Sequence, residues 1–130
     1  MVSEIRAHKI ADKIFRELSL LLIQEVSDPR LNNISITKVS VDRELAFASI
    51  YVSSYKGREA SKAILEGLNH ARGYLRRELS QRIQLRFFPR LRFYWDPIPE
   101  QADRIDMLLD SISEGKATEK IDHEDINPNG

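Results

Sequence analysis

Apolar residues recur every three or four positions over the first part of the chain, which is the spacing of one face of an α-helix. The stripe consists of Ala7, Ala11, Ile14, Leu18, Leu21 and Leu22. Ser3 can cap the start of this helix, and Pro29 in "SDPRL" should end it, because the residue before a proline disfavours the helical conformation. The pattern predicts a long first helix with one side on the core.

Two segments then show the alternation typical of β-strands. Residues 34–41, "ISITKVSV", are rich in β-branched side chains, and their alternation slips between Ile36 and Val39, which predicts a β-bulge. Residues 45–55 alternate regularly and place small and branched side chains on one face: Ala46, Ala48, Ile50 and Val52. The polar "DRE" between the two segments predicts an antiparallel hairpin.

Helical spacing returns over residues 60–83, where Gly73 interrupts the pattern, and a third strand is predicted at residues 90–96, "RLRFYWD". A short helix is expected at 105–112, whereas residues 114–130 have too little apolar surface to fold. The predicted order is α-β-β-α-α-β-α. The fold class is therefore α+β, with a three-stranded sheet covered by helices.

The length of 130 residues allows one domain with a single core. We expect the folded domain over residues 1–97, followed at 98–130 by a short helix and a disordered acidic tail. The chain has no cysteine, no apolar signal segment and no run long enough to span a membrane, so the expected location is the cytoplasm.

Charge is segregated along the chain although the net charge is zero. Residues 1–92 hold 17 Lys and Arg against 10 Asp and Glu, and residues 93–130 hold 3 against 10. The excess is concentrated between Arg58 and Arg92, where nine basic residues accompany three acidic ones. Such a patch is either a solvated surface or a binding site for a polyanion. The local excess of basic over acidic residues favours the binding site.

No arrangement of catalytic or metal-binding residues is recognisable. His8, His70 and His123 lack a paired ligand spacing, the glycines form no phosphate-binding loop, and no serine sits in a nucleophile elbow. Asp42 and Glu44 are better explained by a solvated turn than by acid–base chemistry. We therefore expect a binding protein with no cofactor, no metal and no enzymatic activity.

Gly73 is the most informative single position, because glycine inside a helix costs about 1 kcal/mol relative to alanine. A kink at Gly73 would expose the protein main chain at one place together with nearby cationic side chains, where both could contact the phosphate backbone of a nucleic acid. These cations are Lys62, Arg72, Arg76 and Arg77. The alternative is that Gly73 permits close helix packing. Basic residues on the first helix, Arg6, Lys9, Lys13 and Arg16, either line a binding surface or form a salt-bridged face with Asp12 and Glu17.

Several short motifs stand in an order that resembles the ribosome-binding factor A family. The matching residues are Arg6 and Lys9, "DPR" at Asp28, Pro29 and Arg30, "VSVD" at 39–42 followed by Ala46, "ARG" at 71–73 with Arg76, and Arg86, Pro89, Leu91, Phe93 and Asp96. Each piece is unspecific alone, but their order over about ninety residues is specific. The resemblance implies a type II KH-like fold in which an A-x-G kink at Ala71 to Gly73 replaces the usual G-x-x-G loop between two helices.

The family resemblance also implies a function. It implies binding to the immature small (30S) ribosomal subunit and its 16S-type rRNA, late maturation near the 5′ end, and dissociation afterwards, with assembly GTPases as partners in release and the chain acting as a monomer. The RNA-binding candidates are Arg6, Lys9, Lys62, Arg72, Gly73, Arg76, Arg77, Arg82 and Arg86.

Two other classes stay open on the residues alone. A DNA-binding regulator would use residues 74–82 as a recognition helix, and a protein-interaction module would use the apolar Phe87, Phe88 and Tyr94. Strong preference for one duplex sequence would favour the regulator, whereas partner binding that is insensitive to salt would favour the interaction module.

Overall fold

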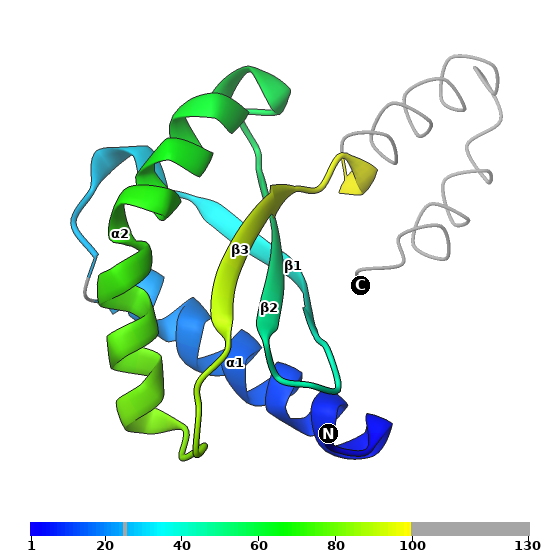
Figure 1. The fold of residues 1–130 in the computed structure, drawn as a ribbon. Coiled ribbons are helices and arrows are strands. Elements are labelled where there is room, and N and C mark those ends of the chain that lie inside the picture. The colour runs from blue at the N-terminus through cyan, green and yellow to red at the C-terminus, as the bar shows by residue number, and fades with distance from the viewer. Residues whose placement is uncertain (25, 100–130) are drawn as a thin grey trace, which may run out of the picture. The chain divides into compact units, whose positions relative to one another are not determined.

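Two long helices and three strands make up the part of the chain that the computed structural model describes, residues 1–24 and 26–99 (Figure 1). In chain order the elements are α1 (Glu4–Gln24), the 3₁₀ turn η1 (Pro29–Leu31), β1 (Ile34–Val41), β2 (Phe47–Ser54), the 3₁₀ turn η2 (Arg58–Ala60), α2 (Ser61–Arg82) and β3 (Arg90–Trp95). Within these ranges no helix is long and apolar enough to cross a membrane. The helix predicted at 105–112 and the tail at 114–130 lie outside the described residues.

The first helix begins at the predicted cap and buries the predicted stripe except Leu22, which is half-buried. The Ser3 hydroxyl accepts a hydrogen bond from the backbone N–H of Arg6 at 3.1 Å, which satisfies one of the free donors of the first turn. The buried side chains of α1 are Ala7, Ile10, Ala11, Ile14, Leu18 and Leu21. One apolar stripe therefore fixes α1 on the core.

The three strands form a mixed sheet in the order β1-β2-β3. The hairpin strands β1 and β2 are antiparallel, and their register shifts between Ile36 and Lys38, which confirms the predicted bulge. In the turn, the Asp42 carboxylate accepts backbone hydrogen bonds from Phe47 at 2.7 Å and Ala46 at 3.3 Å, so Asp42 supports the turn. Strand β3 runs parallel to β2, because α2 carries the chain back along the sheet.

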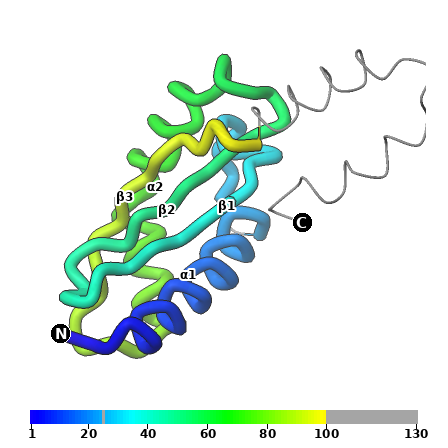
Figure 2. The backbone as a smooth tube through the Cα atoms, turned by 90° about the vertical axis from the view of Figure 1, so that its right-hand side faces the viewer, coloured from blue at the N-terminus to red at the C-terminus, as the bar shows by residue number. Residues whose placement is uncertain are grey.

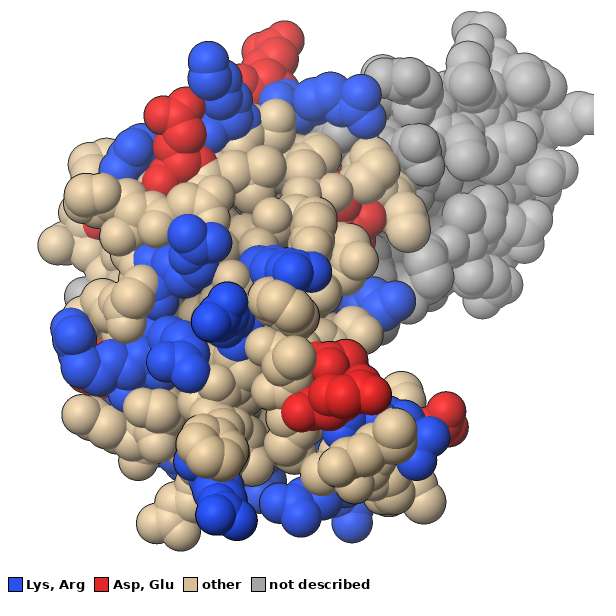
Figure 3. Space-filling view, viewed as in Figure 1, with Lys and Arg blue, Asp and Glu red and all other residues tan. Residues whose placement is uncertain are grey.

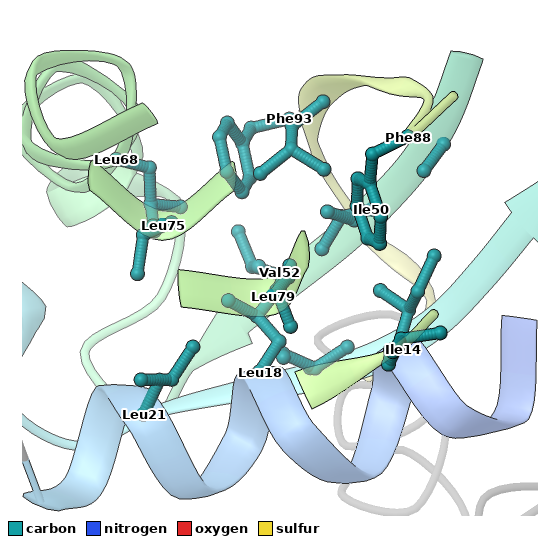
Figure 4. Packing of buried hydrophobic residues seen from close by; sticks show 14 of the residues in the cluster. Ile14, Leu18, Leu21, Ile50, Val52, Leu68, Leu75, Leu79, Phe88 and Phe93 are labelled. Carbon is teal, nitrogen blue, oxygen red and sulfur yellow. The ribbon is translucent and has the colours of Figure 1, made fainter. Parts of the chain in front are cut away.

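One layer of apolar side chains fills the space between the sheet and the two helices. In Figure 4, Ile14 and Leu18 of α1 face the same interior as Ile50 of β2 and Leu75 and Leu79 of α2. Figure 2 shows the strands in front of α2, with α1 along the β1 side. Among the described residues, the opposite face of the sheet is thus left without a covering helix.

The structure corrects two details of the prediction. Helix α2 is assigned as one helix through Gly73 rather than as two helices, although Figure 1 shows that its axis changes direction along its length. The strand predicted at 90–96 ends at Trp95, and Asp96, just beyond β3, is buried and accepts the backbone N–H of Ile98 at 3.0 Å. Asp96 therefore closes the turn after the strand.

Candidate nucleic-acid interface

Gly73 lies on the exposed side of α2. A side-chain carbon built on Gly73 would meet no atom within 4 Å, so the packing explanation for this glycine is wrong. Arg76 and Arg77 follow Gly73 by three and four positions, which places them beside it on the helix surface. An approaching phosphate backbone would therefore reach the main chain of α2 between cationic side chains.

Gly67, which the sequence did not single out, is the glycine of α2 that close packing requires. A side-chain carbon built on Gly67 would stand 3.0 Å from Cδ2 of Leu31 and 3.4 Å from Cβ of Arg30. Leu31 is buried, at 4% exposure. The segment that carries "DPR" therefore rests directly on the backbone of α2.

Three of the predicted cations on α2 are exposed and available to a ligand. The side chains of Lys62 and Arg72 make no hydrogen bond or ion pair with any described residue. The Arg77 guanidinium lies 5.9 Å from the centre of the Tyr74 ring, a cation–π contact that leaves its N–H edges accessible. Lys62 lies on the same side about three turns before Gly73. We call Lys62, Arg72, Gly73 and Arg77 the outer face of α2.

Arg76, by contrast, is already engaged within the domain. Its Nε donates to the carbonyl of Pro89 at 3.1 Å, and its Nη2 donates to the carbonyl of Phe88 at 2.5 Å. Phe88 and Pro89 are buried residues of the segment that leads into β3. The side chain therefore ties α2 to the start of β3, and an RNA contact by Arg76 stays a prediction.

Arg82 joins the two helices. It forms ion pairs with Glu17 of α1 at 3.6 Å and with Glu78 of its own helix at 3.9 Å. In the salt-bridged alternative Glu17 would pair within α1, whereas in the structure it pairs across to α2. Lys13 and Arg16 line a surface hollow together with Arg82, so the basic side of α1 meets the C-terminal end of α2 there.

The remaining candidates occupy separate places. Arg6 and Lys9 are exposed on α1, and their side chains have no hydrogen bond or ion pair to a described residue. The Arg86 guanidinium lies 5.7 Å from the centre of the Phe87 ring, in the loop between α2 and β3. On the face shown in Figure 3, Lys and Arg side chains form a band across the middle of the domain, and Asp and Glu lie mainly above and below it.

The "DPR" motif builds a capped turn. The Asp28 carboxylate accepts the backbone N–H of Arg30 at 2.9 Å, and its Oδ2 accepts Nη2 of Arg30 at 2.7 Å. Pro29 occupies the first position of η1, where a missing N–H costs nothing. The side-chain hydrogen bond from Arg30, followed by the backbone one, lowers the pKa of Asp28 from 3.8 to about 2.

The depressed pKa of Asp28 predicts a stability change in acid. The carboxylate stabilises the fold fully above its unfolded pKa of 3.8, and this contribution is lost as the pH falls towards the folded value of about 2. The free energy of unfolding of Asp28→Asn should therefore fall less steeply over this window than that of the parent chain. Urea midpoints at a series of pH values test this, with Asp12→Asn, an exposed residue of α1, as the control. Parallel curves for Asp28→Asn and the parent would contradict it.

The open face of the sheet carries cations that sequence reasoning did not include among the candidates. Lys38, Arg90 and Arg92 are exposed on strands that contain no acidic residue. The alternation of basic and aromatic residues in "RLRFYW" was the available signal. No group of three or more His, Cys, Asp or Glu that could hold a metal occurs within residues 1–24 and 26–99.

Comparison with known proteins decides the family. The family model described as "Ribosome-binding factor A" matches residues 6–109. The chain belongs to the ribosome-binding factor A family. Ribosome-binding factor A of Thiobacillus denitrificans is 42% identical over 106 residues, which cover 82% of this chain and 86% of that protein.

Solved structures of ribosome-binding factor A share the fold. The crystal structure of the Thermus thermophilus protein has a TM-score of 0.59 and 28% identity, and the match covers 68% of this chain and 93% of that one. A homology model of the Thermus thermophilus factor, fitted into a cryo-electron microscopy map of its complex with the 30S subunit, has a TM-score of 0.58 and 27% identity, covering 71% and 96%. The α+β, type II KH-like fold predicted for the chain is confirmed.

Proposed function

We propose that this chain binds the immature small ribosomal subunit through its 16S-type rRNA, assists late maturation near the 5′ end and then dissociates. The outer face of α2 is the observation that carries the proposal, because Gly73 exposes helix backbone beside the exposed cations Arg72 and Arg77. Membership of the family supports it, and the Thermus relative fitted into a 30S complex supports the choice of subunit.

A binding protein of this kind acts by differential affinity. It shifts a folding equilibrium of the RNA only if it binds one conformer more tightly than another. The chain, acting as a monomer, would hold the immature conformer and leave when maturation removes it. Assembly GTPases are the partners that the family resemblance implies for this release.

The Arg72→Ala/Arg77→Ala double variant should lower affinity for immature subunits about tenfold while the domain stays folded, because both side chains point to solvent. The slope of log affinity against log salt should become shallower by about 1.4 to 1.8, since two phosphate contacts are lost. Co-sedimentation with immature and mature subunits at several salt concentrations measures both quantities.

Lys56→Ala, which removes an exposed cation from the turn after β2, is the control and should bind as the parent does. Undiminished affinity of the folded double variant would remove the outer face of α2 from the interface. Equal affinity of the parent for immature and mature subunits would contradict the proposed mechanism.

A further inference from the structure

The open face of the sheet presents its side chains in ordered rows across the strands. The register pairs Lys38 of β1 with Tyr51 of β2, and Tyr51 with Tyr94 of β3, so these three residues form one row. The two tyrosine rings are stacked, with centres 5.3 Å apart and an angle of 27° between their planes. Lys38 Nζ lies 5.8 Å from the centre of the Tyr51 ring.

The neighbouring rows add hydroxyl groups and guanidinium groups. Ser40, Ser49 and Arg92 are paired in the second row, and Phe47 is paired with Arg90 in the third. The Arg92 guanidinium carbon lies 3.3 Å from the centre of the Phe47 ring, so its plane is held against the sheet. The N–H groups at the edge of a guanidinium held in this way remain accessible to an anion. Because the side chain is already ordered, binding the anion costs little additional side-chain entropy.

All the charged side chains of the three strands are basic. Strands β1, β2 and β3 contain three basic residues, Lys38, Arg90 and Arg92, and no acidic residue. Tyr94 is 39% exposed, so its ring has accessible surface although it stacks on Tyr51. A purely apolar partner would leave these cations without counter-charges, whereas a nucleic-acid strand supplies phosphates for them and bases for the rings.

We propose that the open face of the sheet is a second RNA-binding surface, which takes unpaired nucleotides with a base on Tyr94 and phosphates at Lys38, Arg90 and Arg92. Aromatic side chains on a sheet stack single-stranded bases because every base has a π-face, whereas paired bases are not available for stacking. The outer face of α2 and this face lie on different sides of the domain, since α2 packs on the other side of the sheet. The inference shares with the proposed function only the choice of RNA as partner.

The test uses the full chain and a fluorescein-labelled oligouridylate, with affinity measured by fluorescence anisotropy. Tyr94→Ala should weaken binding about tenfold, whereas Tyr94→Phe, which keeps the ring, should bind within about twofold of the parent. Tyr55→Ala, which removes an exposed tyrosine outside the strands, is the matched control and should bind as the parent does.

A second variant keeps the proposal testable if Tyr94→Ala unfolds. Lys38→Gln combined with Arg90→Gln leaves all three rings in place and should make the salt dependence of oligouridylate binding shallower by about 1.4, for two phosphates. Unchanged affinity of folded Tyr94→Ala, an unchanged salt slope of the charge variant, or equal binding of duplex RNA would overturn the inference. So would self-association that Tyr94→Ala abolishes, because the face would then be a protein contact.

The Arg72→Ala/Arg77→Ala variant separates this inference from the proposed function. It should lose affinity for subunits but keep most of its affinity for oligouridylate, because its changes lie on the other side of the sheet. If Tyr94→Ala binds oligouridylate normally while the α2 variant loses subunits, the second surface fails and the proposed function stands. If the α2 variant keeps full subunit affinity while Tyr94→Ala loses oligouridylate binding, the second surface stands and the site proposed on α2 fails.

Discussion

Arg76→Ala is expected to lower the free energy of unfolding by about 2 to 4 kcal/mol, because it leaves two carbonyls of buried residues, Phe88 and Pro89, without their charged donor. Arg72→Ala, four positions earlier on α2 and exposed, should change it by less than about 0.5 kcal/mol. Arg76→Lys should fall between them, since an ammonium group keeps the charge but lacks the fork that reaches both carbonyls.

Chemical denaturation of the three variants measures these differences. Equal stability of Arg76→Ala and Arg72→Ala would show that the contacts to Phe88 and Pro89 contribute little. The comparison also separates folding from binding: reduced subunit affinity of Arg76→Ala is informative only where the variant is shown to be folded.

Gly67→Val should destabilise the domain by about 1 to 3 kcal/mol, because even its first side-chain carbon would stand 3.0 Å from buried Leu31. Gly73→Val places the same side chain on the same helix in open space, so stability should stay within about 0.5 kcal/mol of the parent. Binding should show the reverse order: folded Gly73→Val loses affinity for immature subunits, because the added methyl groups keep an RNA backbone away from α2.

Unfolding midpoints and co-sedimentation of the two glycine variants decide this prediction together. A stable Gly67→Val would mean that Leu31 can move aside at little cost. Full subunit affinity of Gly73→Val would show that RNA does not approach the helix backbone there.

The sequence was sufficient wherever neighbouring residues set the structure. The bulge in β1 was visible as a slip in alternation at Ile36, and Ser3 indicated the start of α1. It could not distinguish Gly67 from Gly73, because the reason for Gly67 is Leu31, which is distant in the chain. The structural contacts of Arg76 were missed for the same reason, since its two carbonyl acceptors come close to α2 only after the chain turns back.

The candidate site was predicted in part. Arginine content pointed to α2, but the sequence could not show that Arg76 and Arg82 are held by other parts of the domain while Arg72 and Arg77 point outwards. How exposed an arginine side chain is, and which groups it contacts, depends on tertiary packing. Residue type alone does not determine either. The open face of the sheet was overlooked because its rows join residues from three separate strands, and the pairing of β2 with β3 depends on where α2 returns the chain.

The parallel pairing of β2 with β3 also favours one order of folding. Residues 55–89 separate the two strands, whereas β1 and β2 are joined by a short turn. Closing the longer loop costs more chain entropy. We therefore expect β3 to be the last element to join, after the β1–β2 hairpin and α2 have formed. During synthesis, the domain can therefore be completed only after β3 has emerged from the translating ribosome, and the Arg76 contacts form at that moment.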